Sequence, residues 1–152
     1  MSNISTFLWF DHQAEEAANF YTSVIENSKV TGVTNGPDGK AFVVTFELDG
    51  QQFAAMNAGP HFRFTEAVSI HVNRETQAEV DELWEALLAD GGEESQCGWL
   101  KDRYGLSWQV VPSALSKLLA DPDPARAAAA GAALRTMSKI DIAALQAAAD
   151  AA

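Results

Sequence analysis

The chain has 152 residues, 47% of them hydrophobic, and its ten basic and 21 acidic residues give a formal net charge of −11. This length fits one domain, or two small modules that share a core. The negative charge argues against a nucleic-acid backbone or an anionic membrane as partner, and no apolar run is long enough to span a bilayer. With a single cysteine, Cys97, and no export signal in Met1–Asp11, we expect a cytoplasmic protein without an intramolecular disulfide.

The first third of the chain predicts a strand, a helix and three further strands. The helix carries an apolar face of the helical period, and we expect Asp11 to cap it. Asp49-Gly50 is a strong two-residue hairpin signal between the last two strands. The expected elements are Ile4–Phe10, Gln13–Glu26, Lys29–Thr34, Ala41–Leu48 and Gln52–Asn57.

A second strand and helix follow from Ala67. Apolar and polar residues alternate over residues 68–73, which is the period of a half-buried strand. Thr76 and Glu79 form a T-x-x-E capping box, and the apolar residues after it recur at helical spacing until Gly91-Gly92. The later strands are less clear, and we expect them near Glu94–Trp99, with Cys97 on the strand, and over Leu106–Val111.

These two groups of elements repeat one another. At an offset of 64 residues, similar residues coincide in the strand and helix: Ile4 with Val68, Thr6 with Ile70, Leu8 with Val72 and Phe20 with Trp84. At an offset of 55 the last strands coincide: Gly50 with Gly105, Phe53 with Trp108 and Ala54 with Gln109. The offset falls by nine residues between helix and hairpin, so the middle strands of the second module should be shorter.

A helical tail follows Pro112. We expect a first helix over Ser113–Ala120. A second helix should begin after its cap Asp123, with Pro124 at the first helical position. A third is expected over Lys139–Ala149, with Ser138 and Asp141 as the capping pair at its start. Few of its residues are large and apolar, so the tail should pack on the domain or on a dimer partner. The predicted organisation is a domain of residues 1–112, with modules 1–58 and 67–112 and a linker 59–66, followed by a tail of residues 113–152.

Several short motifs resemble one known family. They are Leu8-Trp9-Phe10-Asp11, Ala14-Glu15-Glu16-Ala17, Phe20-Tyr21, Phe46-Glu47-Leu48-Asp49-Gly50, Cys97-Gly98-Trp99-Leu100-Lys101-Asp102, Tyr104-Gly105-Leu106-Ser107-Trp108-Gln109 and the tail motif from Met137 to Leu145. In this order they resemble the PhnB-like, or 3-demethylubiquinone-9 3-methyltransferase-like, branch of the vicinal-oxygen-chelate (glyoxalase-like) superfamily, over residues 3–148. His12 and Arg74 depart from its usual glycine and cysteine.

The resemblance implies an α+β fold of two tandem βαβββ modules that form a glyoxalase-like open barrel around a pocket. It also implies a homodimer, in which the modules are exchanged between subunits or kept within one. Metal-dependent members of the superfamily place His, Gln or Glu ligands on the first and last strands of the modules. Here the last strands offer Ala54 and Gln109, and at most His71, Gln109 and His61 can be assembled. We therefore expect no cofactor, with a divalent metal as the less favoured alternative.

The candidate site is an aromatic pocket with a few polar groups. Its expected lining is Trp9, Asn57, Phe62, Phe64, His71, Trp99, Trp108 and Gln109. His71 is the best general base, since it is the only histidine on a predicted core strand. The competing interpretations are an ordinary core position for each aromatic residue and a structural role for His71. Asp102, between Lys101 and Arg103, is expected to form an ion pair in a turn.

The residues leave three functions open. The first is that of a PhnB-like protein that binds a small organic molecule, either with or without chemical transformation of it. The second is a non-catalytic sequestering protein, and the third is a metal-dependent lyase or dioxygenase. The chain holds no glycine-rich strand-to-helix turn of the kind that a nucleotide-like cofactor favours, so it offers no recognisable methyl-donor site.

Overall fold

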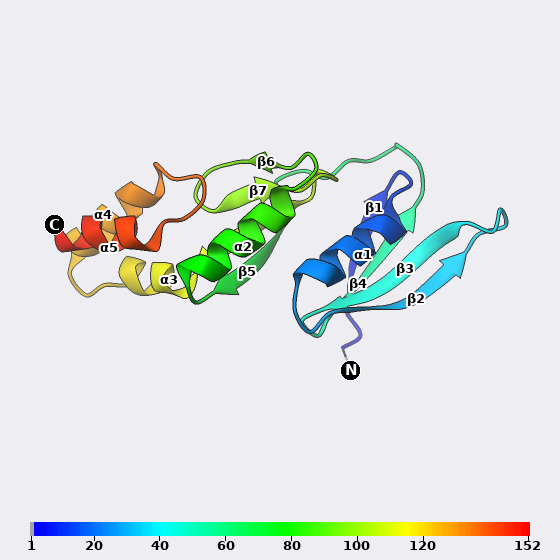
Figure 1. Ribbon diagram of the computed structural model, residues 1–152, viewed down its shortest axis with the longest axis horizontal. Coiled ribbons are helices and arrows are strands. Elements are labelled where there is room, and N and C mark those ends of the chain that lie inside the picture. The colour runs from blue at the N-terminus through cyan, green and yellow to red at the C-terminus, as the bar shows by residue number, and fades with distance from the viewer. Residues whose placement is uncertain (1) are drawn as a thin grey trace. The chain divides into compact units, whose positions relative to one another are not determined.

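The computed structural model describes residues 2–152, and the chain divides into two compact units, Met1–Phe64 and Thr65–Ala152 (Figure 1). The first unit contains β1 (Thr6–Phe10), α1 (Ala14–Val24), β2 (Lys29–Asn35), β3 (Ala41–Leu48) and β4 (Gln51–Asn57). The second contains β5 (Ser69–Arg74), α2 (Gln77–Leu88), β6 (Glu93–Glu94), β7 (Trp99–Lys101), β8 (Ser107–Pro112), α3 (Ser113–Leu119), α4 (Pro124–Leu134) and α5 (Ile142–Asp150). Within residues 2–152, no helix has both the length and the hydrophobicity needed to cross a membrane.

Each unit is built on one four-stranded sheet, and the two sheets have the same topology. The strand orders are β1-β4-β3-β2 and β5-β8-β7-β6. In both, the first strand lies parallel to the last, and the remaining neighbours are antiparallel. Neither sheet closes on itself. The predicted α+β fold of two βαβββ modules is therefore confirmed.

The internal repeat holds at the level of single residue pairs. In the first unit Thr6 pairs with Phe53 across the parallel β1–β4 ladder, and in the second Ile70 pairs with Trp108 across β5–β8. These are the pairs that the two sequence offsets connect. The shortening of the second module is also present, because β6 and β7 have two and three residues where β2 and β3 have seven and eight.

The strand expected over Glu94–Trp99 is wrong, because the chain turns within it. Cys97 and Gly98 have φ angles of 60° and 85°, in the left-handed region that extended strands do not use. The pairing is therefore split between β6 and β7, and Cys97 lies in the turn that joins them.

The core of the first unit lies between α1 and the strands. Small residues of α1 and Tyr21 are fully buried, and the Tyr21 ring lies 6.3 Å from that of Phe46, which stacks on Phe53 at 5.3 Å. The expected cap by Asp11 is wrong. Gln13 holds the N-cap position without a side-chain bond, and the amide N–H of Ala14 donates to Oδ1 of Asn57 at 2.8 Å. A side chain from β4 therefore caps this helix.

In the second unit α2 begins at the predicted capping box, with Thr76 accepting from the Glu79 amide and Glu79 accepting from the Thr76 amide. The helix buries one face, which consists of Val80, Leu83, Trp84 and Leu87. On the sheet, Trp108 and Val110 of β8 are fully buried.

The tail packs on the second module of the same chain. A buried cluster joins the end of β8 to the three tail helices: Val111, Leu115, Leu118, Ala130, Ile140, Leu145 and Ala149. Asp123 caps α4 as expected, with Pro124 in its first turn. The expected start of the last helix at Lys139 is wrong. Asp141 caps it from Ile142, and the residues before it make other contacts, described below.

Candidate ligand-binding face

The second sheet presents two different faces, because successive side chains of a strand point to opposite sides. Trp108 and Val110 are fully buried, as is Leu100, the neighbour of Trp108 on β7, and these residues share the face toward α2. The residues between them, such as Gln109, therefore point to the other side of the sheet. We call that other side the polar face.

The strand register arranges the polar face in two rows. Gln109 pairs with His71 on one side and with Trp99 on the other, which makes the row Trp99–Gln109–His71. Two residues earlier on β8, the second row is Lys101–Ser107–Ser69. His71 is exposed, and Trp99 and Gln109 are half-buried, so the first row can be reached from solvent.

Hydrogen bonds fix part of this face and leave part of it unused. Nε2 of Gln109 donates to Oγ of Ser69 at 2.9 Å, which orients the carboxamide. The buried hydroxyl of Ser107 has no hydrogen-bond partner within residues 2–152. A buried polar atom without a partner is uncommon, since it costs about 1–3 kcal/mol. The face therefore combines a fixed amide with spare hydrogen-bonding capacity.

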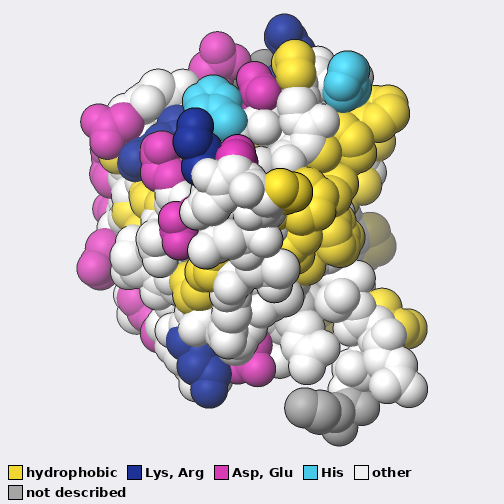
Figure 2. Space-filling view, turned by 90° about the vertical axis from the view of Figure 1, so that its right-hand side faces the viewer, with side chains coloured by type: hydrophobic (Ala, Val, Ile, Leu, Met, Phe, Trp, Pro, Cys, Tyr) yellow, Lys and Arg dark blue, Asp and Glu magenta, His cyan; other side chains and the backbone are white. Residues whose placement is uncertain are grey.

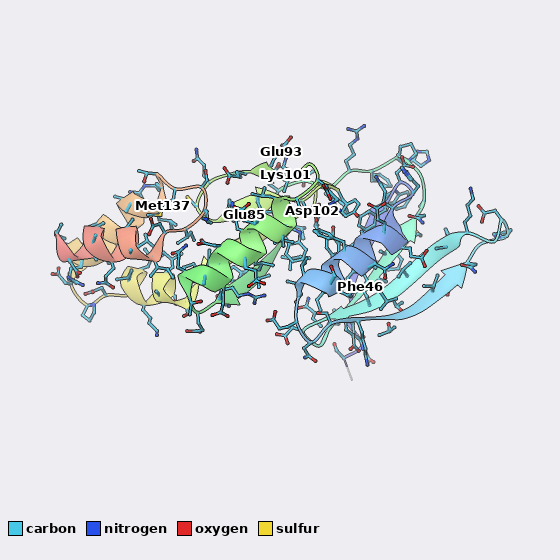
Figure 3. The ribbon with its side chains drawn as sticks, in the orientation of Figure 1. Phe46, Glu85, Glu93, Lys101, Asp102 and Met137 are labelled. Atoms are coloured by element: carbon cyan, nitrogen blue, oxygen red, sulfur yellow. The ribbon has the colours of Figure 1, made fainter. Side chains whose placement is uncertain are left out.

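Lys101 and Glu66 form an ion pair beside the second row. The hydrogen bond from Lys101 lowers the pKa of Glu66, and the same bond raises the pKa of Lys101. Both groups are solvent-exposed, so the pair contributes little to stability. It fixes the position of the Lys101 ammonium group, and Figure 3 labels Lys101 next to Asp102.

The equivalent face of the first unit is apolar and aromatic. Phe7 pairs with Ala54 as His71 pairs with Gln109, and Phe7 is 56% exposed. Beside it, Trp9 donates from its indole N–H to the Gly59 carbonyl at 2.9 Å, and Phe62 packs edge-on against the Trp9 ring at 4.8 Å. Figure 2 shows hydrophobic side chains gathered over one side of the surface that it draws, with acidic side chains mostly over the other.

The structure thus divides the predicted site residues into three groups. His71, Trp99 and Gln109 form one row, and Trp9 and Phe62 form an aromatic pair in the other unit. The remaining three make contacts on the helix-covered sides. Trp108 is fully buried, Phe64 packs edge-on against the buried Phe10 at 5.3 Å, and Asn57 is bonded to Ala14 and Ala41.

A resident divalent metal needs several donor side chains that converge on one point. The last strands of the two modules offer Ala54 and Gln109, and their partners on the first strands are Phe7 and His71. Two of these side chains have no donor atom, and a glutamine oxygen is a neutral ligand. In the part of the chain that the structure describes, no group of three His, Cys, Asp or Glu side chains converges. The residues therefore do not fit a tightly held metal ion.

An open cleft in the first unit was not expected from the sequence. It has a volume of about 750 Å³ and lies where the start of α1 meets the β2–β3 hairpin. Its lining includes Asp11, His12, Glu15, Phe42 and Asn57. Two sequence observations lie near it: His12 departs from the family pattern, and Asn57 was expected to line a pocket.

Two units with this repeated topology define a glyoxalase-like α+β fold. The model of the family described as 3-demethylubiquinone-9 3-methyltransferase matches residues 2–111, and the chain belongs to that family. The resemblance drawn from the short motifs is thereby confirmed over residues 3–111.

Solved structures agree with this assignment. The PhnB protein of Bacillus cereus is 34% identical with a TM-score of 0.68, and the comparison covers 74% of this chain and 100% of that one. Protein PA1353 of Pseudomonas aeruginosa is 19% identical (TM-score 0.61, 74% and 98% covered). The fosfomycin resistance protein FosX of Listeria monocytogenes is 15% identical (TM-score 0.53, 74% and 93% covered). The last two show the shared fold alone. No curated protein matches the chain.

Proposed function

We propose that this protein binds a small organic molecule on the polar face of its second sheet, in contact with Trp99, Gln109 and His71. The observation that carries the proposal is that one row of the sheet places an indole, a fixed carboxamide and an imidazole side by side. A flat aromatic side chain supplies contact area, and a few placed polar groups orient the ligand, as is typical of small-molecule sites.

The row favours a ligand with a planar part and a polar substituent. The planar part would pack on Trp99, and the substituent would reach Gln109 and His71. Because Nε2 of Gln109 already donates to Ser69, its Oε1 is the atom left to accept a hydrogen bond from the ligand. The Ser69 hydroxyl, which accepts that bond, keeps its own proton to donate.

If the bound molecule is transformed, His71 is the group that we propose as general base. It is exposed on the row, and an imidazole is the side chain that most often acts as a general base. Binding without chemical change, as in a sequestering protein, is the alternative. We do not propose methyl transfer, despite the family description, because the sequence has no glycine-rich turn suited to a nucleotide-like methyl donor.

The experiment is a fragment screen followed by ¹H–¹⁵N NMR on the full chain. The library should contain flat ring compounds with hydrogen-bonding substituents. We expect bound fragments to shift amide signals of β5, β7 and β8, and we expect His71→Ala and Trp99→Ala each to weaken binding by about tenfold. His12→Ala is the matched control, because His12 is exposed and lies on the first unit. Hits that map to the His12 cleft instead, or an absence of hits, would overturn the proposal.

A second measurement separates an enzyme from a sequestering protein. A bound ligand is recovered after prolonged incubation and analysed by mass spectrometry. A changed mass that disappears with His71→Ala indicates catalysis through His71. An unchanged ligand with tight binding indicates sequestration. A changed mass that persists in His71→Ala removes the general-base role.

We also propose that the protein is a cytoplasmic homodimer. Large hydrophobic side chains of the first unit are exposed, with Ile4 at 82%, Phe62 at 66% and Phe7 at 56%, and a second copy of the chain could cover them. The single cysteine suits a reducing compartment. Light scattering coupled to gel filtration tests the dimer, and a monomer at micromolar concentration would contradict it.

A further inference from the structure

The tail residues before α5 lie against the turn that precedes β7. The amide N–H of Cys97 donates to the Met137 carbonyl at 2.8 Å, and that of Gly98 donates to the Ser138 carbonyl at 2.8 Å. Figure 3 labels Met137 on the segment between α4 and α5. Because these donors lie in a turn, outside the sheet ladder, the tail provides partners that the second module itself does not supply.

The same tail segment is held at its other end by Gln77 of α2. Nε2 of Gln77 donates to the Ile140 carbonyl at 3.0 Å, and its Oε1 accepts from the amide of Ile142 at 2.8 Å. Lys139, the residue before Ile140, forms an ion pair with Asp81 of α2 at 3.0 Å. One carboxamide therefore binds the backbone on both sides of Asp141.

Ile140 inserts its side chain between these two anchoring points. It is fully buried within the cluster that joins the tail to β8. Gly98 makes this possible, since a Cβ atom there would lie 2.7 Å from Cδ1 of Ile140 and 3.0 Å from the Val110 carbonyl. Gly98 also has a φ of 85°, so two independent reasons require glycine.

The clamped turn leads directly into the polar face. The carbonyl of Gly98 accepts from the amide of Val110 at 2.9 Å, and the next residue, Trp99, pairs with Gln109. β7 has only three residues, so its own ladder gives Trp99 little support. The backbone on either side of this short strand must therefore help to fix the indole.

We propose that the tail segment 137–142 is a clamp that positions Trp99 on the polar face, with Gln77 and Ile140 as its positioning residues. The effect of this clamp on ligand affinity rests on the ligand site proposed above. The family model ends at residue 111, so a segment beyond the matched module sets the affinity of a site within it.

The test compares Gln77→Met with the matched control Gln146→Met in the full chain. Methionine keeps the volume and helix propensity of glutamine but removes its hydrogen bonds to Ile140, Ile142 and Asp81, and Gln146 is exposed on α5. We expect Gln77→Met to speed hydrogen exchange of the Cys97 and Gly98 amides by about tenfold, the effect of losing roughly one to two hydrogen bonds. We also expect Gln77→Met to shift the NMR signal of the Trp99 indole N–H and to lower the affinity for the fragment by about threefold or more. Gln146→Met should change none of these.

The outcomes separate the clamp from the ligand site. An unchanged Trp99 indole signal in Gln77→Met overturns the clamp without any ligand being needed. The second outcome concerns a fragment whose binding is weakened by His71→Ala. If Gln77→Met shifts the Trp99 indole signal but leaves the affinity for this fragment unchanged, the clamp has no role at the ligand site. If no fragment binds the wild type, the ligand proposal fails, while the indole signal still decides the clamp. Ile140→Ala is the second variant, and it should repeat the effects of Gln77→Met.

Discussion

The carboxylate of Asp102 accepts a hydrogen bond of 2.9 Å from the indole N–H of Trp108, and both side chains are buried. Oδ1 of the same carboxylate accepts from the amides of Tyr104 and Leu106, at 2.8 and 3.1 Å. A charge buried beside the turn between β7 and β8 is thus stabilised by several donors. Because it fixes the start of β8, it also contributes to the register that brings Trp99 beside Gln109.

Asp102→Asn is therefore predicted to destabilise the protein. An amide group can reproduce only part of the acceptor set, and its own N–H₂ would face a donor. We expect the free energy of unfolding to fall by about 1–3 kcal/mol, measured by urea denaturation. Asp38→Asn is the control, because Asp38 accepts from the Lys40 amide in an exposed turn and asparagine can do the same. Equal stabilities for the two variants would contradict the assigned role of Asp102.

The role of Asp102 illustrates what the sequence could not give. Its position between Lys101 and Arg103 favours an ion pair in a turn, yet the printed sequence does not show that the residue is buried beneath Trp108. Its neighbours also form ion pairs, Lys101 with Glu66 and Arg103 with Asp90. Burial depends on residues brought together by the fold, which local patterns do not specify.

Patterns that are local in the chain did predict structure. The Asp49-Gly50 hairpin has the positive φ angles of 48° and 81° that its residues favour, and the Thr76–Glu79 capping box forms as expected. The two offsets matched residues that occupy equivalent positions in the two parallel ladders. Alternation could also have separated Trp108 from Gln109, since neighbouring residues of a strand cannot line the same face. The clamp by Gln77 had no local signal, because 63 residues separate it from Ile140.

Removal of divalent metal is predicted to leave ligand binding unchanged. Phe7 and Ala54 supply no donor at two of the four equivalent positions of the repeat, and only His71 is a strong ligand among the rest. Fragment affinity should therefore be the same before and after dialysis against EDTA, with untagged protein and metal analysis of the sample. A loss of affinity that Mn²⁺ or Zn²⁺ restores would support the metal-dependent alternative.

Protonation of the Asp81 carboxylate at low pH is predicted to weaken the contact between α2 and the tail. The hydrogen bond from Gln77, followed by that from Lys139, lowers the pKa of Asp81 below its ordinary value of 3.8. A carboxylate whose pKa is lower in the folded state stabilises that state above the unfolded value, and the contribution is lost as the pH falls through the folded value. The effect therefore belongs to the range below about pH 4.

Asp81→Asn isolates this contribution. Unfolding by urea between about pH 2 and pH 6 should show a smaller loss of stability on acidification in the variant than in the wild type. Because Asp81 is partly exposed, high salt should reduce the difference that arises from Lys139. Identical pH profiles for the two proteins would show that Asp81 does not support the tail.

Asn57 provides a final test, because it was expected to line the ligand pocket and is instead bonded to the backbone at two points. Oδ1 accepts from the amide of Ala14 at the start of α1, and Nδ2 donates to the Ala41 carbonyl at 3.0 Å. Asn57→Ala removes both bonds, and we predict a loss of about 1–2 kcal/mol in the free energy of unfolding, with faster exchange of the Ala14 amide. Asn19→Ala, on the exposed side of the same helix, should not destabilise the protein. If Asn57→Ala instead left stability unchanged and abolished fragment binding, the ligand would have to lie in the first unit, on the side where Asn57 meets the cleft.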